Sequence, residues 1–264
     1  MNISDRSTAS VLIGSIGSTG ATAPKIADAY AHAVQISKSA SELYIPQDSL
    51  SLAVFAALED GRDPGNDEEV RRIVATNTFA NPGITQSLDT LAWEGFRTVC
   101  RSNLLTAVKA MRVPFDAGAA TLAKAHALIG DVPLEDTATI IARGGEVAEA
   151  WAQATKAVKV IDAADNALQA LGTITRTSSN DRRYRVLRLA EVDYATWITL
   201  ELEGRKVSPW EAVRMGLTLS LPTVAEYRER VSVITTAQAQ AQMLEQQTGR
   251  DNASGKRPAN QLLA

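Results

Sequence analysis

Apolar residues recur along most of this chain at the three- and four-residue spacing of amphipathic α-helices. Alanine carries much of the pattern, for example in residues 27–33, 117–127 and 148–170. Alanine loses no side-chain entropy on entering a helix and lets neighbouring helices approach closely. The pattern therefore predicts an all-α protein, built as a multi-helix bundle with a long helical hairpin.

Several helix starts are marked by residues that supply or replace backbone hydrogen bonds. Pro24 fits the first position of a helix, where its missing N–H costs nothing. Ser208 followed by Glu211, and Thr223 followed by Glu226, have the spacing of capping boxes. We therefore expect helices to begin at these three points.

Two stretches leave the secondary structure less clearly defined. A helix that begins after Asn81-Pro82-Gly83 is expected to end near Arg112, because Val113-Pro114 disfavours helical backbone. Residues 197–203 fit helical spacing but also alternate like a strand. A small β-hairpin near 183–207 therefore stays open as an alternative to a helix.

Composition along the chain suggests four segments. Residues 1–23 are rich in Ser, Thr, Gly and Ala and are expected to form a flexible N-terminal arm. Residues 24–172 form an alanine-rich helical domain, and a Thr/Ser/Asn loop over 172–181 separates it from a C-terminal helical region at 181–248. Residues 249–264 are predicted to be a flexible, mildly basic tail.

The overall composition narrows the class of protein. Hydrophobic residues make up 45% of the 264 residues but aromatic residues only 5%, so the core must rest mainly on small aliphatic side chains. Such a core favours extra burial by subunit association, and we expect a homo-oligomer. The net charge of −3 argues against nucleic acid covering the whole surface. No apolar run is long enough to span a bilayer, so we expect no membrane partner and a cytoplasmic or virion location.

The most regular segment has a heptad-like seam. Its apolar members follow one another at alternating spacings of three and four, with Asp165 as one acid among them. We predict that this seam is an interface for self-association or for a protein partner, formed by Val147, Trp151, Ala154, Val158, Ile161 and Leu168.

Two groups of arginines are candidates for contact with nucleic acid or an acidic partner. Arg182, Arg183 and Arg185 belong to the densest basic cluster, which also contains nearby acids. Arg228 and Arg230 lie in residues 208–231, whose pattern resembles a helix-turn-helix with extra residues in the turn. The second helix would also carry Glu226 and Glu229, so DNA contact is the alternative and not the favoured interpretation.

No residue pattern indicates catalysis, a cofactor or a metal. His32 and His126 lack a second ligand at helical spacing, and the single Cys100 cannot form an internal disulfide. The glycines of residues 14–20 have GxxGxxG spacing and lack the strand–helix alternation of a nucleotide-binding fold. We therefore expect no catalytic, cofactor-binding or metal-binding residues, and no enzyme activity.

One part of the chain resembles a known group of proteins. Residues 122–130, 141–145 and 150–154 look like uncharacterised alanine-rich helical proteins of actinobacterial phages and prophages, commonly encoded near virion genes. The resemblance covers about residues 50–170 and implies no functional residues. It favours a non-enzymatic structural or protein-interaction protein, as a virion component or assembly factor. The alternative is a DNA-binding regulator that uses residues 208–231.

Overall fold

The computed structural model describes residues 3–42, 48–79, 82–177, 184–204 and 207–253, and these are almost entirely helical. No strand forms within these ranges, so the predicted all-α class is confirmed. Along the chain the helices are α1 (Ile3–Thr19), α2 (Pro24–Glu42), α3 (Ser49–Glu59), α4 (Glu68–Phe79), α5 (Pro82–Ile129), α6 (Thr137–Ala142), α7 (Gly145–Thr175), α8 (Arg185–Leu189), α9 (Tyr194–Leu202), α10 (Pro209–Arg214) and α11 (Val224–Ala253).

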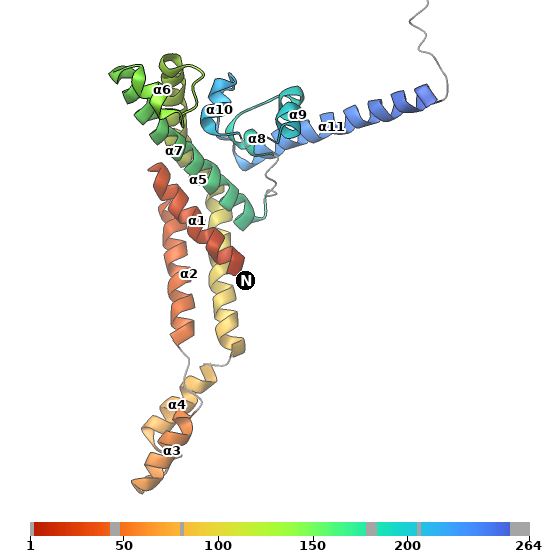
Figure 1. Cartoon of the computed structure of the whole chain (residues 1–264). Helices are drawn as coiled ribbons and strands as arrows, with labels where there is room; N and C mark the ends of the chain where they lie inside the picture. The colour runs from red at the N-terminus through yellow and green to blue at the C-terminus, as the bar shows by residue number, and fades with distance from the viewer. Residues whose placement is uncertain (1–2, 43–47, 80–81, 178–183, 205–206, 254–264) are drawn as a thin grey trace, which may run out of the picture.

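Helix α5 is the central element, and its 48 residues span about 72 Å at the usual rise per residue. Its first half packs against α2 and its second half against α7, while α1 lies along α7. Helices α3 and α4 form a hairpin beyond the first end of α5, and α8 to α10 lie beside the second half (Figure 1). The result is an elongated body with a long arm, α11, that leaves it on one side.

One continuous core runs through most of the described helices. Fully buried side chains from α5 and α7 form its centre, and apolar residues of α1, α2 and α8 to α11 join the same cluster. At the α2–α5 contact, Tyr30, Trp93 and Phe96 make three edge-to-face ring pairs with centroids 5.8–6.0 Å apart. The segments 24–172 and 181–248 therefore share a core, and the described parts do not form two separately packed units.

The first segment differs from the flexible arm expected for residues 1–23. Residues 3–19 form α1, and Ala9, Leu12 and Ile16 on one face of that helix are buried in the core. Their spacing of three and four residues is helical, but Ser, Thr and Gly on the other face obscured it. The prediction was wrong because packing against α7 stabilises a helix that its composition alone does not favour.

The expected end of a helix at Arg112 was also wrong. Helix α5 continues through Pro114 to Ile129, and Met111, Phe115 and Leu122 are completely buried along this stretch. A proline inside a helix costs about 3 kcal/mol, whereas each large apolar side chain that becomes buried contributes about 1.5–3 kcal/mol. Tertiary packing on both sides of Pro114 therefore outweighs the local preference to stop.

The β-hairpin alternative near 183–207 is excluded for the described part of that stretch. Residues 185–189 and 194–202 form α8 and α9, and the pairing seen here is a single bridge between Ala190 and Leu219. The Asp193 side chain accepts a hydrogen bond from the Thr196 N–H at 2.7 Å and so caps α9. Helix α7 also extends to Thr175 and so includes the first four residues of the loop predicted from Gly172.

The predicted helix starts are confirmed. Helix α2 begins at Pro24, and the Ser208 hydroxyl accepts from the Glu211 N–H at the start of α10. Thr223 and Glu226 form a reciprocal capping box at α11, with Glu226 N–H donating to Thr223 Oγ1 at 3.2 Å and Thr223 N–H donating to Glu226 Oε2 at 2.6 Å. The expected tail falls partly in α11, which reaches Ala253, and residues 254–264 lie outside the described residues.

Candidate interaction surfaces

The heptad-like seam of α7 lies inside the molecule. Ala154, Ile161 and Leu168 are buried in the core, and Val147, Trp151 and Val158 are half-buried and pack against it. A Cβ added at Gly118 of α5 would lie only 3.3 Å from Ile161 Cγ1, which shows how closely the two helices approach. The predicted interface is therefore corrected: these residues hold α7 to helices of the same chain, and Ala154, Ile161 and Leu168 are not accessible to a partner.

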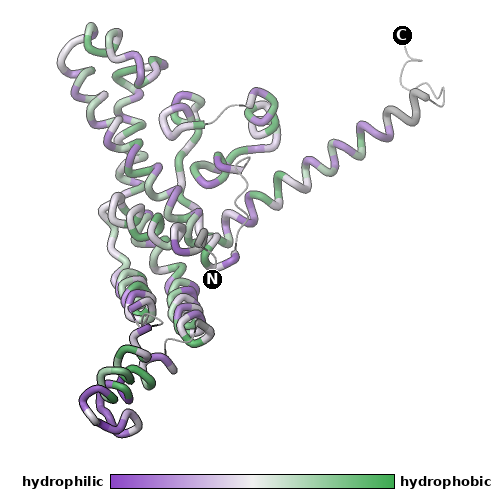
Figure 2. The backbone as a smooth tube through the Cα atoms, turned by 60° about the horizontal axis from the view of Figure 1, so that its bottom comes forward, coloured by the Kyte–Doolittle hydropathy of each residue, from purple (hydrophilic) through white to green (hydrophobic). Residues whose placement is uncertain are grey.

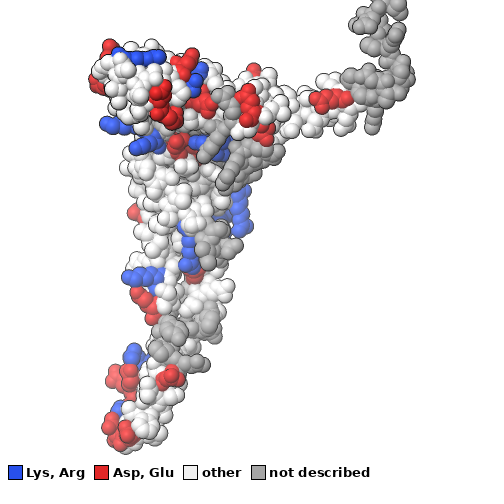
Figure 3. Space-filling model, viewed as in Figure 1, with Lys and Arg blue, Asp and Glu red and all other residues white. Residues whose placement is uncertain are grey.

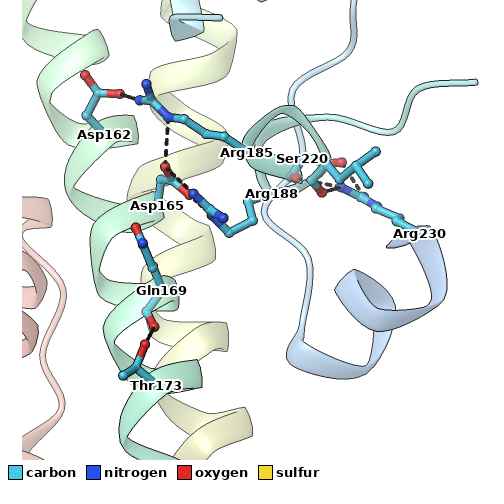
Figure 4. A network of polar contacts seen from close by, with 9 residues as sticks. Asp162, Asp165, Gln169, Thr173, Arg185, Arg188, Ser220 and Arg230 are labelled. Carbon is cyan, nitrogen blue, oxygen red and sulfur yellow. Dashed lines mark hydrogen bonds and ion pairs between the residues drawn. The ribbon is translucent and has the colours of Figure 1, made fainter. Parts of the chain in front are cut away.

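Asp165 of that seam is the centre of a buried ion-pair network that joins α7 to α8 (Figure 4). Its carboxylate accepts from Arg188 Nε at 2.5 Å and from Arg185 Nε at 3.1 Å, and Arg185 also donates to Asp162 at 2.8 Å. The Asp165 and Arg188 side chains are only 2% and 5% exposed. This acid, which interrupts the apolar seam in the sequence, therefore serves to anchor α8.

The neighbours of Arg188 explain why its guanidinium stays protonated although the side chain is buried. Burial alone would lower the pKa of Arg188, but the attraction of the Asp165 carboxylate outweighs it and raises that pKa. The guanidinium also lies over the ring of Tyr227 in α11, 5.9 Å from its centroid. The pair thus links three helices, which is a structural role and leaves no charge available for a ligand.

The arginines proposed to contact nucleic acid or an acidic partner are engaged in the fold wherever they are described. Arg185 faces Asp162 and Asp165, and Arg228 donates to the backbone oxygen of Thr177. Arg230 donates to Leu187 O at 2.9 Å and to the Ser220 side chain at 2.7 Å, and its burial lowers its pKa. Arg182 and Arg183 lie outside the described residues. The five residues are therefore not seen to form one basic surface.

Residues 208–231 do not adopt a helix-turn-helix. Helix α10 ends at Arg214 after six residues, and α11 begins only at Val224. The segment between them includes Leu219, which bridges to Ala190. A helix-turn-helix joins its two helices by a turn of three or four residues. The observed connection is longer and extended, so the resemblance in sequence did not predict the local structure.

The cysteine and histidine side chains that could act as reactive groups make packing or local contacts within the fold. Cys100 is completely buried in α5, and burial raises the pKa of its thiol to about 12. His126 contacts Asp131 at 3.1 Å and lies edge-on to Trp210. Among the described residues no group of three or more His, Cys, Asp or Glu could hold a metal ion. None of the described helices has the length and apolar character needed to cross a bilayer.

Helix α3 presents the most apolar exposed surface that we find. Leu52, Phe55 and Leu58 are 66%, 60% and 61% exposed, although α3 has only eleven residues. Only Ala57 of α3 is fully buried, and the hairpin contacts lie outside the main core cluster. A helix that is apolar on all sides is normally covered on all sides. Figure 2 shows this apolar helix beside the hydrophilic loop that follows it.

The charge of the α3–α4 hairpin is strongly negative. Residues 48–79 contain seven acidic and three basic residues, which gives a net charge of −4. Acidic groups gather at this end of the molecule in Figure 3. All three arginines act within the hairpin: Arg62 pairs with Asp60 and Asp67, Arg72 pairs with Glu69, and Arg71 bonds to Gly65 O and Asn66. The surface around the exposed apolar residues is therefore acidic.

Two acids share the outer face of α3 with the exposed apolar residues. Asp48, Leu52, Phe55 and Glu59 follow at spacings of four, three and four, so they lie along one side of the helix. All four are exposed, and the Asp48 side chain makes no capping hydrogen bond. We call this set the α3 face. It combines two central apolar side chains with a carboxylate at either end.

The second exposed feature is the outer part of α11. After Ile234, which is buried, no described side chain of this helix is buried as far as Gln247. Glu245 is the only charged residue of residues 235–247, and Met243 and Leu244 are 64% and 65% exposed. Figures 1 and 2 both show this part of α11 projecting from the body. It extends the reach of the chain without contributing to the core.

From the sequence, no residue of the α3 face was singled out as a candidate interaction residue. The available signal was the apolar character of almost every position from Leu50 to Leu58, which exceeds what one buried face requires. Comparison with known proteins adds no further guide: no family model, curated protein or solved structure matches this chain.

Proposed function

We propose that this chain is a non-enzymatic structural or protein-interaction protein that self-associates through the α3–α4 hairpin. The observation that carries the proposal is the exposure of Leu52, Phe55 and Leu58 on one short helix. Contiguous exposed apolar surface of this kind marks protein interaction sites. A virion component or assembly factor is the setting that we propose, supported by the resemblance to phage proteins.

The shape of the molecule supports the same function. The hairpin lies at one end of an elongated body and the α11 arm leaves from elsewhere, so each protein carries two separate projecting elements (Figure 1). Contacts between unlike surfaces of identical subunits generate rings or filaments. An elongated subunit with two well-separated contact elements is suited to such assembly.

The test is absolute mass by light scattering over a hundredfold concentration range. We expect the mass to exceed 28.2 kDa and to rise with concentration. The Leu52→Gln/Phe55→Gln variant, which replaces exposed side chains only, should stay at 28.2 kDa. Leu202→Gln is the matched control, because Leu202 on α9 is the most exposed large apolar side chain among the described residues; the mass of this variant should follow that of the wild type.

A wild-type mass of 28.2 kDa at every concentration would contradict self-association. Assembly that is equally strong in the Leu52→Gln/Phe55→Gln variant would remove the hairpin from the proposal. Circular dichroism of each variant verifies that the helical content is unchanged.

A further inference from the structure

We infer that the α3 face binds the basic segment 254–264 of a second copy, so that the chains join head to tail. This inference rests on the proposed self-association and names the two surfaces that meet. It depends on the acidic and apolar character of the α3 face, on the composition of residues 254–264, and on the distance between them in one chain.

The charge of the hairpin selects against the simplest alternative, which is a contact between two hairpins. Each hairpin carries a net charge of −4, with Asp48 and Glu59 on the exposed face itself. Two such faces placed together would bring like charges into contact, which is unfavourable for association. The partner of this face must therefore supply positive charge together with apolar side chains.

Residues 254–264 have that composition. They contain Lys256 and Arg257, no acidic residue, and the apolar pair Leu262-Leu263. The two basic groups can face a carboxylate at one end of the α3 face, and the leucines, which follow five to seven residues later, can cover Leu52 and Phe55. The segment thus offers the two kinds of contact that the α3 face lacks within its own chain.

The geometry requires that the segment comes from another copy. The base of α11 is attached to α5 at Arg112, whose Nε donates to Leu221 O at 2.8 Å. Arg112 lies about 45 Å along α5 from Pro82, and the hairpin lies beyond that end. Helix α11 then leads away from the hairpin in both views (Figures 1 and 2).

The length of the segment cannot close this gap. Ten residues beyond Ala253 reach at most about 36 Å even when fully extended. This is shorter than the separation along α5 alone, before the additional displacement along α11 is counted. Binding within one chain is therefore excluded, whereas a neighbouring chain can meet the hairpin with its own segment.

A contact between unlike surfaces leaves one free hairpin and one free segment at the ends of every assembly. Further copies can bind at these ends, so the assembly either closes into a ring or grows as an open filament. Because part of the attraction is electrostatic and exposed, assembly should weaken as the salt concentration rises.

The experiment uses two full-length variants that each lack one side of the contact. Lys256→Glu/Arg257→Glu disables the segment, and Leu52→Gln/Phe55→Gln disables the hairpin. Each alone should remain at 28.2 kDa in light scattering. When mixed, they should form pairs at twice that mass and nothing larger, because only one productive contact exists between them. Lys156→Glu/Lys159→Glu, on an exposed side of α7, is the matched control with the same change in net charge and should assemble as the wild type does.

A charge exchange tests which residues meet. Asp48→Lys/Glu59→Lys should not assemble alone, but mixing it with Lys256→Glu/Arg257→Glu should form complexes because the charges are complementary again. If the segment variant assembles as the wild type does, the inference is overturned while self-association stands. If the wild type is a monomer throughout, the proposed function fails as well. In the mixture of Lys256→Glu/Arg257→Glu with Leu52→Gln/Phe55→Gln, growth beyond two chains or a complete lack of association would also overturn the head-to-tail contact.

Discussion

Replacement of Asp165 by Asn is expected to destabilise the protein by about 3–5 kcal/mol, because it leaves the Arg188 guanidinium buried without a counter-charge. The Asp165 and Arg188 side chains are 2% and 5% exposed, so water cannot compensate for the loss. Arg188 donates to both carboxylate oxygens of Asp165, at 2.5 and 3.5 Å. The loss is large beside the 5–15 kcal/mol that typically stabilises a native protein.

Asp162→Asn is the matched control for this substitution. Asp162 pairs with Arg185, but its side chain is 38% exposed and Arg185 keeps Asp165 as a partner. Exposed ion pairs contribute about 1 kcal/mol or less. The two variants therefore make the same chemical change one helical turn apart, with different expected costs because the burial differs.

The assay is urea denaturation followed by circular dichroism at 222 nm, with the free energy of unfolding obtained by linear extrapolation. We expect the wild type to be the most stable, Asp162→Asn to be slightly less stable, and Asp165→Asn to be the least stable of the three. The double variant Asp165→Leu/Arg188→Met should be more stable than Asp165→Asn, since it leaves no unpaired charge. Equal effects of Asp162→Asn and Asp165→Asn would refute the argument that burial of the pair sets the cost.

Two further predictions concern the N-terminal helix and the buried thiol. Removal of residues 1–19 should lower the free energy of unfolding by several kcal/mol, because it uncovers the surface that buries Leu12 and Ile16; an unchanged urea midpoint would indicate an arm that does not contribute. Since burial raises the pKa of Cys100 to about 12, the folded thiol stays neutral where the unfolded thiol ionises. Stability is therefore complete below about pH 9 and should fall as the pH rises from 9 toward 12, and less steeply in Cys100→Ala. An identical pH dependence in that variant would argue against this assignment.

Local sequence signals predicted the helical class and several helix starts well. Pro24, the cap at Ser208 and the Thr223–Glu226 box act through backbone groups within one turn, so their effect depends little on the remainder of the fold. The same short-range reasoning failed at Pro114 and in α1. In both places distant helices bury apolar side chains, and that gain outweighs the local preference.

For the candidate interaction sites, too, the sequence showed local patterns but not the packing that determines their role. The apolar seam of α7 was visible as a pattern, but a pattern cannot say whether its partner is another chain or α5 of the same chain. Asp165 looked like a break in the seam, and its meaning depended on Arg188, twenty-three residues away. The excess of apolar positions in α3 was visible in the sequence, but which of them stay exposed depends on what packs nearby.

The sequence by itself determined that the chain forms alanine-rich helices and where several of them begin, because caps, prolines and helical periodicity act over a few residues. Only the tertiary structure decided which apolar faces are covered. It placed the α7 seam against α5, directed Arg185, Arg188 and Arg230 into the fold, and left Leu52 and Phe55 at the surface. The physical reason is that burial and charge pairing are properties of neighbours in space, which can lie far apart along the chain.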